Sequence, residues 1–252
     1  MIRVLHGIGG RPGHLAPLLD ALGRRSTEDA ADASPVLIGH GDAAPAAPAP
    51  TGDVREPAAG ADHDWILAAA RDWVDRAGDG AGPDLLIGHS TGGVIALSAL
   101  AEGLVRPRGL VVIDSNVPVD AAALAARADK ARLATAPDWR ERLRASLARD
   151  LVAPEPWPAR ILADLDATAD HPMRELWGAV LTADPRPLWA AASVPVLYVR
   201  STRQVRQADL DRLTERARVV DVSAHAGGHW PHLADPVGVA RAIRDWRAET
   251  GV

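Results

Sequence analysis

Short apolar runs alternate with longer amphipathic stretches along most of the chain. Apolar residues between Leu15 and Leu22 recur at the three- and four-residue interval of an amphipathic helix, and similar stretches follow most of the runs. This alternation predicts a doubly wound, mostly parallel α/β sheet. The runs that predict about six buried strands are Ile2–Leu5, Pro35–Gly39, Leu85–Ile87, Gly109–Ile113, Val194–Val199 and Ala217–Val222.

The segment 118–192 interrupts this alternation. It shows helical spacing broken by prolines and contains no strand-like run. We therefore predict an inserted cap of about four helices at 118–192, and an α/β core made of residues 1–117 and 193–252. Residues 42–61 are dominated by Ala, Pro and Gly, so we expect a surface loop there.

The stretch Gly88-His89-Ser90-Thr91-Gly92 lies directly between a predicted strand and a predicted helix. A serine flanked by glycines two residues away on each side is typical of a nucleophile elbow, in which the glycines allow the strand and the helix to approach closely. The serine Oγ then lies on a strained turn beside the first N–H groups of the helix. This pattern predicts that Ser90 is a nucleophile.

Three other polar side chains also follow predicted strands, namely His6, Asp114 and His229. Ligands of doubly wound sheets bind at the carboxyl ends of the strands, so we expect these residues near Ser90. The glycine-rich loop after His6 lacks a phosphate-binding P-loop pattern, and Pro12 replaces the third glycine of a dinucleotide fingerprint. A plain tight turn and a loop that offers backbone N–H groups to an oxyanion both remain open.

Composition excludes several classes of function. The 252 residues carry a formal net charge of −5, which gives no reason to expect nucleic acid or an anionic membrane as a partner. The chain has no cysteine, so disulfides and thiolate catalysis are excluded. The first residues lack a secretory signal, and no apolar run approaches the ~20 residues of a membrane span. We expect a cytoplasmic protein that acts on a small molecule, and its oligomeric state stays open.

Three histidines near the C-terminus, His225, His229 and His232, raise the question of a metal site. Gly227 and Gly228 would break any helix that aligned the first two, and no carboxylate accompanies them at ligand spacing. We therefore expect no metal and no cofactor, and we interpret His225 and His232 as surface or pocket-rim residues.

Taken together, these motifs resemble the α/β-hydrolase family with a helical cap, over nearly the whole chain. The resemblance rests on the loop His6–Gly10, on Gly88–Gly93, and on His229 with its neighbours. It implies that Ser90 is the nucleophile, that His229 is the base, and that the backbone N–H groups of Ile8 and Thr91 form the oxyanion hole. It also implies that substrate contacts come from Gly7, His89 and Trp230.

Two features depart from the family pattern. Only five residues precede His6, so we expect the antiparallel strand pair that usually opens the fold to be absent and the sheet to have six strands. The usual position of the acid, after the Val194–Val199 strand, falls near Gln204, which cannot stabilise an imidazolium by charge. Some members of the family take their acid from the end of the strand after the nucleophile helix, and the resemblance therefore implies Asp114, which follows the strand Gly109–Ile113. Gln204 is the alternative orienting residue.

The expected activity is hydrolysis of an ester, or a related acyl bond, of a small apolar substrate through an acyl-enzyme. Tryptophans of the cap favour an apolar pocket, although they would equally serve to pack its helices. The arginines Arg200, Arg203 and Arg206 would meet an anionic group on the substrate or simply face solvent. Three alternatives stay open: a non-hydrolytic epimerase, lyase or cyclase, a thioesterase for carrier-bound acyl chains, and a ligand-binding receptor.

Overall fold

The computed structural model describes residues 1–24, 34–41, 61–78, 82–202, 205–212, 217–225 and 227–252. Within them lies one parallel sheet of five strands, which follow one another in chain order. This arrangement confirms the predicted doubly wound parallel sheet. The strands are β1 (Ile2–Leu5), β2 (Leu85–His89), β3 (Gly109–Ile113), β4 (Val196–Arg200) and β5 (Ala217–Asp221).

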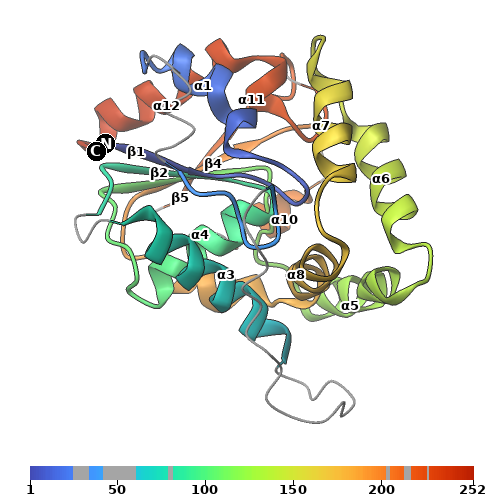
Figure 1. The fold of residues 1–252 in the computed structure, drawn as a ribbon. Coiled ribbons are helices and arrows are strands. Elements are labelled where there is room, and N and C mark those ends of the chain that lie inside the picture. Colours follow the sequence, from blue (N-terminus) through green and yellow to red (C-terminus); the bar gives the residue numbers. More distant parts are fainter. Residues whose placement is uncertain (25–33, 42–60, 79–81, 203–204, 213–216, 226) are drawn as a thin grey trace.

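Helices cover both faces of the sheet (Figure 1). On one face lie the short 3-10 helix η1 (Pro12–Leu15) and the helices α1 (Ala16–Ala21), α11 (Pro231–Ala234) and α12 (Pro236–Thr250). On the other face lie α3 (Ala61–Ala77) and α4 (Thr91–Ala101). Because side chains alternate along a strand, Ile87 belongs to the apolar cluster that contains Trp246 of α12, whereas its neighbour Leu86 belongs to the cluster that contains Trp73 of α3. Both faces are apolar, as a buried parallel sheet requires.

Between β3 and β4 the chain forms the inserted helical region that the sequence predicted. It contains one short helix more than the four expected, and Figure 1 shows α5 to α8 at the end of the sheet away from the two termini. Because β1 begins beside the N-terminus, this is the end where the strands finish. The five helices are α5 (Ala121–Thr135), α6 (Trp139–Asp150), α7 (Trp157–Asp166), α8 (Asp170–Thr182) and α9 (Pro185–Ala190).

The strand predicted at Pro35–Gly39 is wrong, because this segment is not part of the sheet. The segment is held along β1 by side chains instead of by a backbone ladder. Ser34 Oγ accepts a hydrogen bond from the Val4 N–H at 2.9 Å, and His6 Nε2 accepts one from the Leu37 N–H at 2.9 Å. The apolar run reflects burial of Leu37 and Ile38, not strand pairing.

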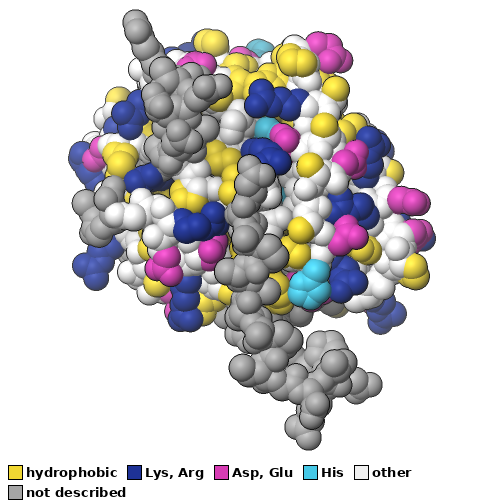
Figure 2. Space-filling model, in the orientation of Figure 1, with side chains coloured by type: hydrophobic (Ala, Val, Ile, Leu, Met, Phe, Trp, Pro, Cys, Tyr) yellow, Lys and Arg dark blue, Asp and Glu magenta, His cyan; other side chains and the backbone are white. Residues whose placement is uncertain are grey.

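The last third of the chain agrees with the predicted order of strands and helices. The helix predicted from Gln207 begins there as α10 (Gln207–Leu210), and its predicted end lies outside the described residues. None of the described helices is both long and apolar enough to cross a membrane. On the face shown in Figure 2, basic and acidic side chains are interspersed with apolar ones.

Candidate active site

Ser90 occupies the sharp turn between β2 and α4. Its backbone angles, φ 52° and ψ −122°, lie in a region that side chains other than glycine rarely adopt. The turn can be this tight because glycines flank it, and a side chain at either position would collide with the backbone. A Cβ on Gly88 would lie 2.6 Å from the Gly92 carbonyl oxygen, and a Cβ on Gly92 would lie 2.3 Å from that of Leu5.

Hydrogen bonds from the neighbouring strand hold this turn in place. The Ser90 N–H donates to the Ile113 carbonyl at 2.9 Å, and Ser115 Oγ donates to the Ser90 carbonyl at 2.6 Å. The end of β3 and the residues just after it therefore fix the backbone of Ser90 through both its N–H and its carbonyl.

A continuous chain of hydrogen bonds joins Ser90, His229 and Asp114. His229 Nε2 lies 2.9 Å from Ser90 Oγ, and His229 Nδ1 lies 2.6 Å from Asp114 Oδ2. Asp114 is fully buried at the end of β3, with a positive φ of 42°. An ionised carboxylate can only accept, so His229 Nδ1 carries the hydrogen of that bond and Nε2 is left to accept the serine proton.

The loop that carries His229 is fastened to both the core and the cap. The His229 N–H donates to the Asp150 carbonyl at the end of α6 at 2.9 Å, and His89 Nε2 donates to the His229 carbonyl at 2.8 Å. The Trp230 ring packs edge-on against the His229 ring, with centroids 4.9 Å apart. The imidazole therefore has little freedom to turn away from Ser90.

The two expected oxyanion donors lie beside the serine. Thr91 is the first residue of α4, so its N–H has no carbonyl partner within the helix and lies at the positive end of the helix dipole. Ile8 lies at the tip of a turn closed by the Gly10 N–H, which donates to the Gly7 carbonyl at 3.0 Å. Ile8 and Thr91 both line the same cavity as Ser90 and His229.

Two cavities meet at the serine, and we call them the large lobe and the small lobe. Both are lined by Ile8, Ser90, Leu147 and His229. The large lobe, about 350 Å³, extends under the cap, and Trp177 is the one cap tryptophan among its lining residues. The small lobe, about 10 Å³, is enclosed by Gly7, Gly10, His14, His89, Ile161 and Trp230. All three expected substrate contacts, Gly7, His89 and Trp230, thus line the small lobe.

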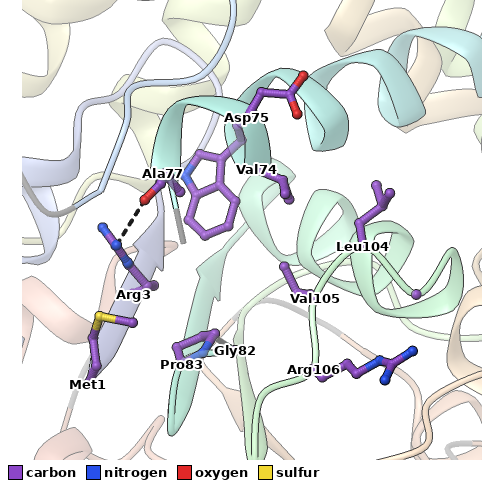
Figure 3. Close-up of a pocket in the computed structure, with 13 residues that line it drawn as sticks. Met1, Arg3, Val74, Asp75, Ala77, Gly82, Pro83, Leu104, Val105 and Arg106 are labelled. Carbon is purple, nitrogen blue, oxygen red and sulfur yellow. Dashed lines mark hydrogen bonds between the residues drawn. The ribbon is translucent and has the colours of Figure 1, made fainter. Parts of the chain in front are cut away.

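A third pocket, of about 420 Å³, is shown in Figure 3 and shares no lining residue with either lobe. It is lined by Met1, Arg3, Pro83 and Arg106, which precede or begin β1, β2 and β3, so it is at the amino ends of the strands. Its described lining contains no serine and no histidine. The one carboxylate in its described lining is that of Asp75, so the pocket has neither the hydroxyl nor the imidazole that the two lobes share.

Burial keeps several histidines around the site neutral. Burial and the neighbouring His40 hold the pKa of His6 well below its ordinary value, and burial together with His232 and His229 does the same for His89. Burial lowers the pKa of His40 to about 4 and that of His232 to about 3. These rings therefore add no positive charge near Ser90 at neutral pH.

His232 corrects the interpretation from sequence, since it is fully buried and not a surface or rim residue. Its ring lies 4.5 Å from that of His89, and its two nitrogens find no hydrogen-bond partner within the described part of the chain. His225 is exposed, as expected. No group of three or more potential metal ligands is found among the described residues.

The sequence offered further candidates near the rim of the site. Gln204 and Arg203 lie outside the described residues, so the alternative to Asp114 is left open there. Arg206 is held by Asp209 and Asp120, each at 2.8 Å, and it is not among the residues that line either lobe.

Sequence reasoning missed a second carboxylate–histidine pair. His14 Nε2 lies 2.7 Å from Asp164 Oδ2, and Arg11 Nε lies 2.9 Å from Asp164 Oδ1. Asp164 belongs to α7 of the cap, whereas His14 lies in η1 and Arg11 directly precedes it. The only signal in the sequence was a histidine soon after the glycine-rich loop, and nothing there indicated its partner 150 residues away.

The family model described as the alpha/beta hydrolase family matches residues 4–242. The chain therefore belongs to the alpha/beta hydrolase family, which confirms the resemblance inferred from its motifs. A search of curated proteins finds no match.

Solved structures with a similar fold come from several bacteria. A hydrolase from Pseudomonas aeruginosa PA01 is 18% identical, with a TM-score of 0.68 over 97% of this chain and 88% of that one. A putative aryl esterase from Burkholderia cenocepacia is 17% identical, with a TM-score of 0.61 over 99% and 90%. The enol-lactonase from Burkholderia xenovorans LB400 is 16% identical, with a TM-score of 0.59 over 98% and 90%. At these identities the likeness shows a shared fold and nothing further.

Proposed function

We propose that this protein is a serine hydrolase that cleaves an ester, or a related acyl bond, of a small substrate through an acyl-enzyme. The observation that carries the proposal is the continuous chain of hydrogen bonds from Ser90 Oγ through His229 to the buried Asp114. A nucleophile, a base and a group that orients the base, each within hydrogen-bond reach of the next, are the parts that acyl transfer needs.

The chemistry follows from the positions of these atoms. Ser90 Oγ attacks the carbonyl carbon while His229 Nε2 takes its proton, and the imidazolium is stabilised by Asp114. The N–H groups of Ile8 and Thr91 bind the oxyanion, and such a donor typically contributes about 10²–10³ in rate. His229 then gives its proton to the leaving alcohol, which leaves the acyl group on Ser90.

The large lobe supports a compact and mostly apolar substrate. Its volume of about 350 Å³ is at the lower end of ligand sites. Leu143, Trp177 and Val180 supply apolar walls, while Lys130 and Arg149 add positive charge on α5 and α6. Esters and lactones are the substrates named for two of the similar structures, and both bond types are open to attack by Ser90.

The test is covalent labelling combined with turnover. A fluorophosphonate probe should label the parent protein on Ser90, and the parent should hydrolyse 4-nitrophenyl acetate. Ser90→Ala should lose both properties and keep its melting temperature, because it removes one oxygen from a turn held by backbone contacts. If Ser90→Ala hydrolyses the ester at the parent rate, the nucleophile is another group. Labelling without turnover over a panel of esters would instead favour a non-hydrolytic enzyme.

A further inference from the structure

The small lobe brings a second carboxylate–histidine pair to the same serine. His14 is 3% exposed, and its ring lines the small lobe together with Ser90 and His229. On the basis of the proposed function, we propose that the small lobe binds the water that hydrolyses the acyl-enzyme, and that His14, oriented by Asp164, positions this water.

The size of the small lobe suits this role. About 10 Å³ is open to the centre of a water-sized molecule, which is room for one water and little more. Two glycines keep this space open. A Cβ on Gly7 would lie 3.1 Å from His89 Nδ1, and a Cβ on Gly10 would lie 3.1 Å from His14 Nδ1. The large lobe is left for the substrate, so acyl group and water reach Ser90 from different sides.

Asp164 determines which nitrogen of His14 is available. Burial alone would raise the pKa of Asp164, but hydrogen bonds from His14 and Arg11 outweigh it and hold this pKa below its ordinary value. Asp164 is therefore an ionised acceptor, and His14 Nε2 must carry the hydrogen of their 2.7 Å bond. In the neutral ring, Nδ1 then has a free lone pair on the side of Gly10, which is a wall of the small lobe.

The arrangement gives each hydrogen of the water its own acceptor. One O–H donates to His14 Nδ1, while His229 Nε2 removes the proton of the other as the water oxygen attacks the carbonyl carbon of the acyl-serine. The tetrahedral intermediate then breaks its bond to Ser90 Oγ, which takes the proton back from His229. The products are the free acid and Ser90 with its hydroxyl restored. Because Asp164 lies on α7, the cap completes the water site.

The proposal predicts that losing His14 slows deacylation and leaves acylation intact. In His14→Leu, stopped-flow measurements with 4-nitrophenyl acetate should show a burst of 4-nitrophenolate at close to the parent rate. The ratio of the later steady rate to the burst rate should be about tenfold lower than in the parent, as expected for the loss of one hydrogen bond at the transition state of deacylation. Mass spectrometry during turnover should find more acetylated Ser90 than in the parent.

Three further variants make the result specific. His14→Gln keeps a donor and an acceptor and should recover part of the deacylation rate. Asp164→Asn should slow deacylation in the same direction, because Nε2 loses its charged acceptor, and it serves as the test if His14→Leu does not fold. His171→Phe changes an exposed histidine of α8 that packs on Trp65, and it should behave as the parent does.

Two outcomes would overturn the water site. One is deacylation at the parent rate in His14→Leu, or in Asp164→Asn where the first variant does not fold. The other is a changed ratio of burst rates for 4-nitrophenyl acetate and 4-nitrophenyl butyrate in His14→Leu relative to the parent. That result would make the small lobe a pocket for the acyl group. Failure of the proposed function looks different: the parent itself would then form no acetyl adduct on Ser90.

Discussion

Ser90 and Asp114 both hold backbone conformations with positive φ, and these are the only two non-glycine residues to do so among the described ones. Each such residue costs about 1–3 kcal/mol and persists only where its surroundings impose it. Here the surroundings are the hydrogen bonds from Ser90 to the Ile113 carbonyl and from the Asp114 N–H to the Val199 carbonyl, at 2.9 and 3.0 Å. The backbone strain therefore lies at the two residues whose side chains are joined by His229.

Asp114→Asn tests the orienting role of this carboxylate. The amide preserves the shape of the side chain but removes the charge that stabilises the imidazolium, and it can bond His229 in the wrong tautomer. We expect kcat for 4-nitrophenyl acetate to fall by about 10⁴-fold, with little change in melting temperature.

Asp209→Asn is the matched control. Like Asp114, Asp209 is a buried carboxylate, but its partners are Arg206 and Arg212 and it lies outside both lobes. It should keep the parent kcat. A parent-like rate in Asp114→Asn would move the orienting role to another residue, of which Gln204 is the first to examine.

Much of the site could be placed from single residues. Ser90 came from its motif between a strand and a helix, whereas the roles of His229 and Asp114 came from the family resemblance together with their positions after predicted strands. His14 and Asp164 could not be found in this way, because their pairing depends on how α7 of the cap lies over the loop after β1. A hydrogen bond between a core loop and an inserted helix leaves no periodic trace in either segment.

At the scale of elements, close packing between β1, β2 and α4 decides the position of the nucleophile. Gly92 of α4 rests directly on the carbonyl groups of Leu5 and His6. Gly92→Ala would force α4 away from β1, so we expect a loss of about 1–3 kcal/mol in unfolding free energy. We also expect a loss of esterase activity beyond what the stability change explains, since Ser90 moves with the helix.

Gly178→Ala in α8 provides the comparison. The nearest atom to its added Cβ would be 3.6 Å away, which is an ordinary contact. Alanine also has a higher helix propensity than glycine in a helix interior. This variant should be as stable as the parent or more so, measured by urea unfolding at the same pH. Equal stability of both alanine variants would contradict the role given to close packing at Gly92.

The sequence pattern was reliable for elements that bury a whole face and unreliable where side chains replace the backbone ladder. Strands β1 to β5 and helix α12 follow their apolar runs closely. The run Pro35–Gly39 is equally apolar, but its Leu37 N–H donates to His6 Nε2 and the Val4 N–H of β1 donates to Ser34 Oγ, so no backbone ladder forms between them. Periodicity records burial, and burial alone does not distinguish a paired strand from an extended segment.

At the scale of the whole molecule, the buried histidines make stability depend on pH. A histidine whose pKa is lowered by folding takes up its proton more readily in the unfolded chain. The contribution of each such histidine to stability is therefore fully present above its unfolded pKa of 6.5. It is lost progressively as the pH falls toward the pKa of that histidine in the folded protein. The slope is about 1.4 kcal/mol per pH unit for each such residue. The residues concerned are His6, His40, His89 and His232.

His232→Leu tests this dependence at one position. The pKa of His232 is lowered to about 3, so its share of the loss extends from pH 6.5 down toward pH 3. Leucine has a similar volume, does not titrate and leaves no unpartnered nitrogen in the core. Relative to the parent, the variant should gain more stability at pH 5 than at pH 8 in urea unfolding. The same gain at both values would show that His232 does not titrate in this range.

The hydrogen bond from the His229 N–H to the Asp150 carbonyl also has a consequence for how this enzyme can be changed. The last residue of α6 belongs to the insertion, yet it holds the backbone of the proposed base. An insertion taken from a relative would bring a new binding pocket but would have to rebuild this contact and the Asp164 carboxylate. In evolutionary and engineering terms, the cap is not an interchangeable module. We expect the substrate range of the enzyme to change through single substitutions along the large lobe, while Asp150 at the end of α6 and Asp164 of α7 stay the same.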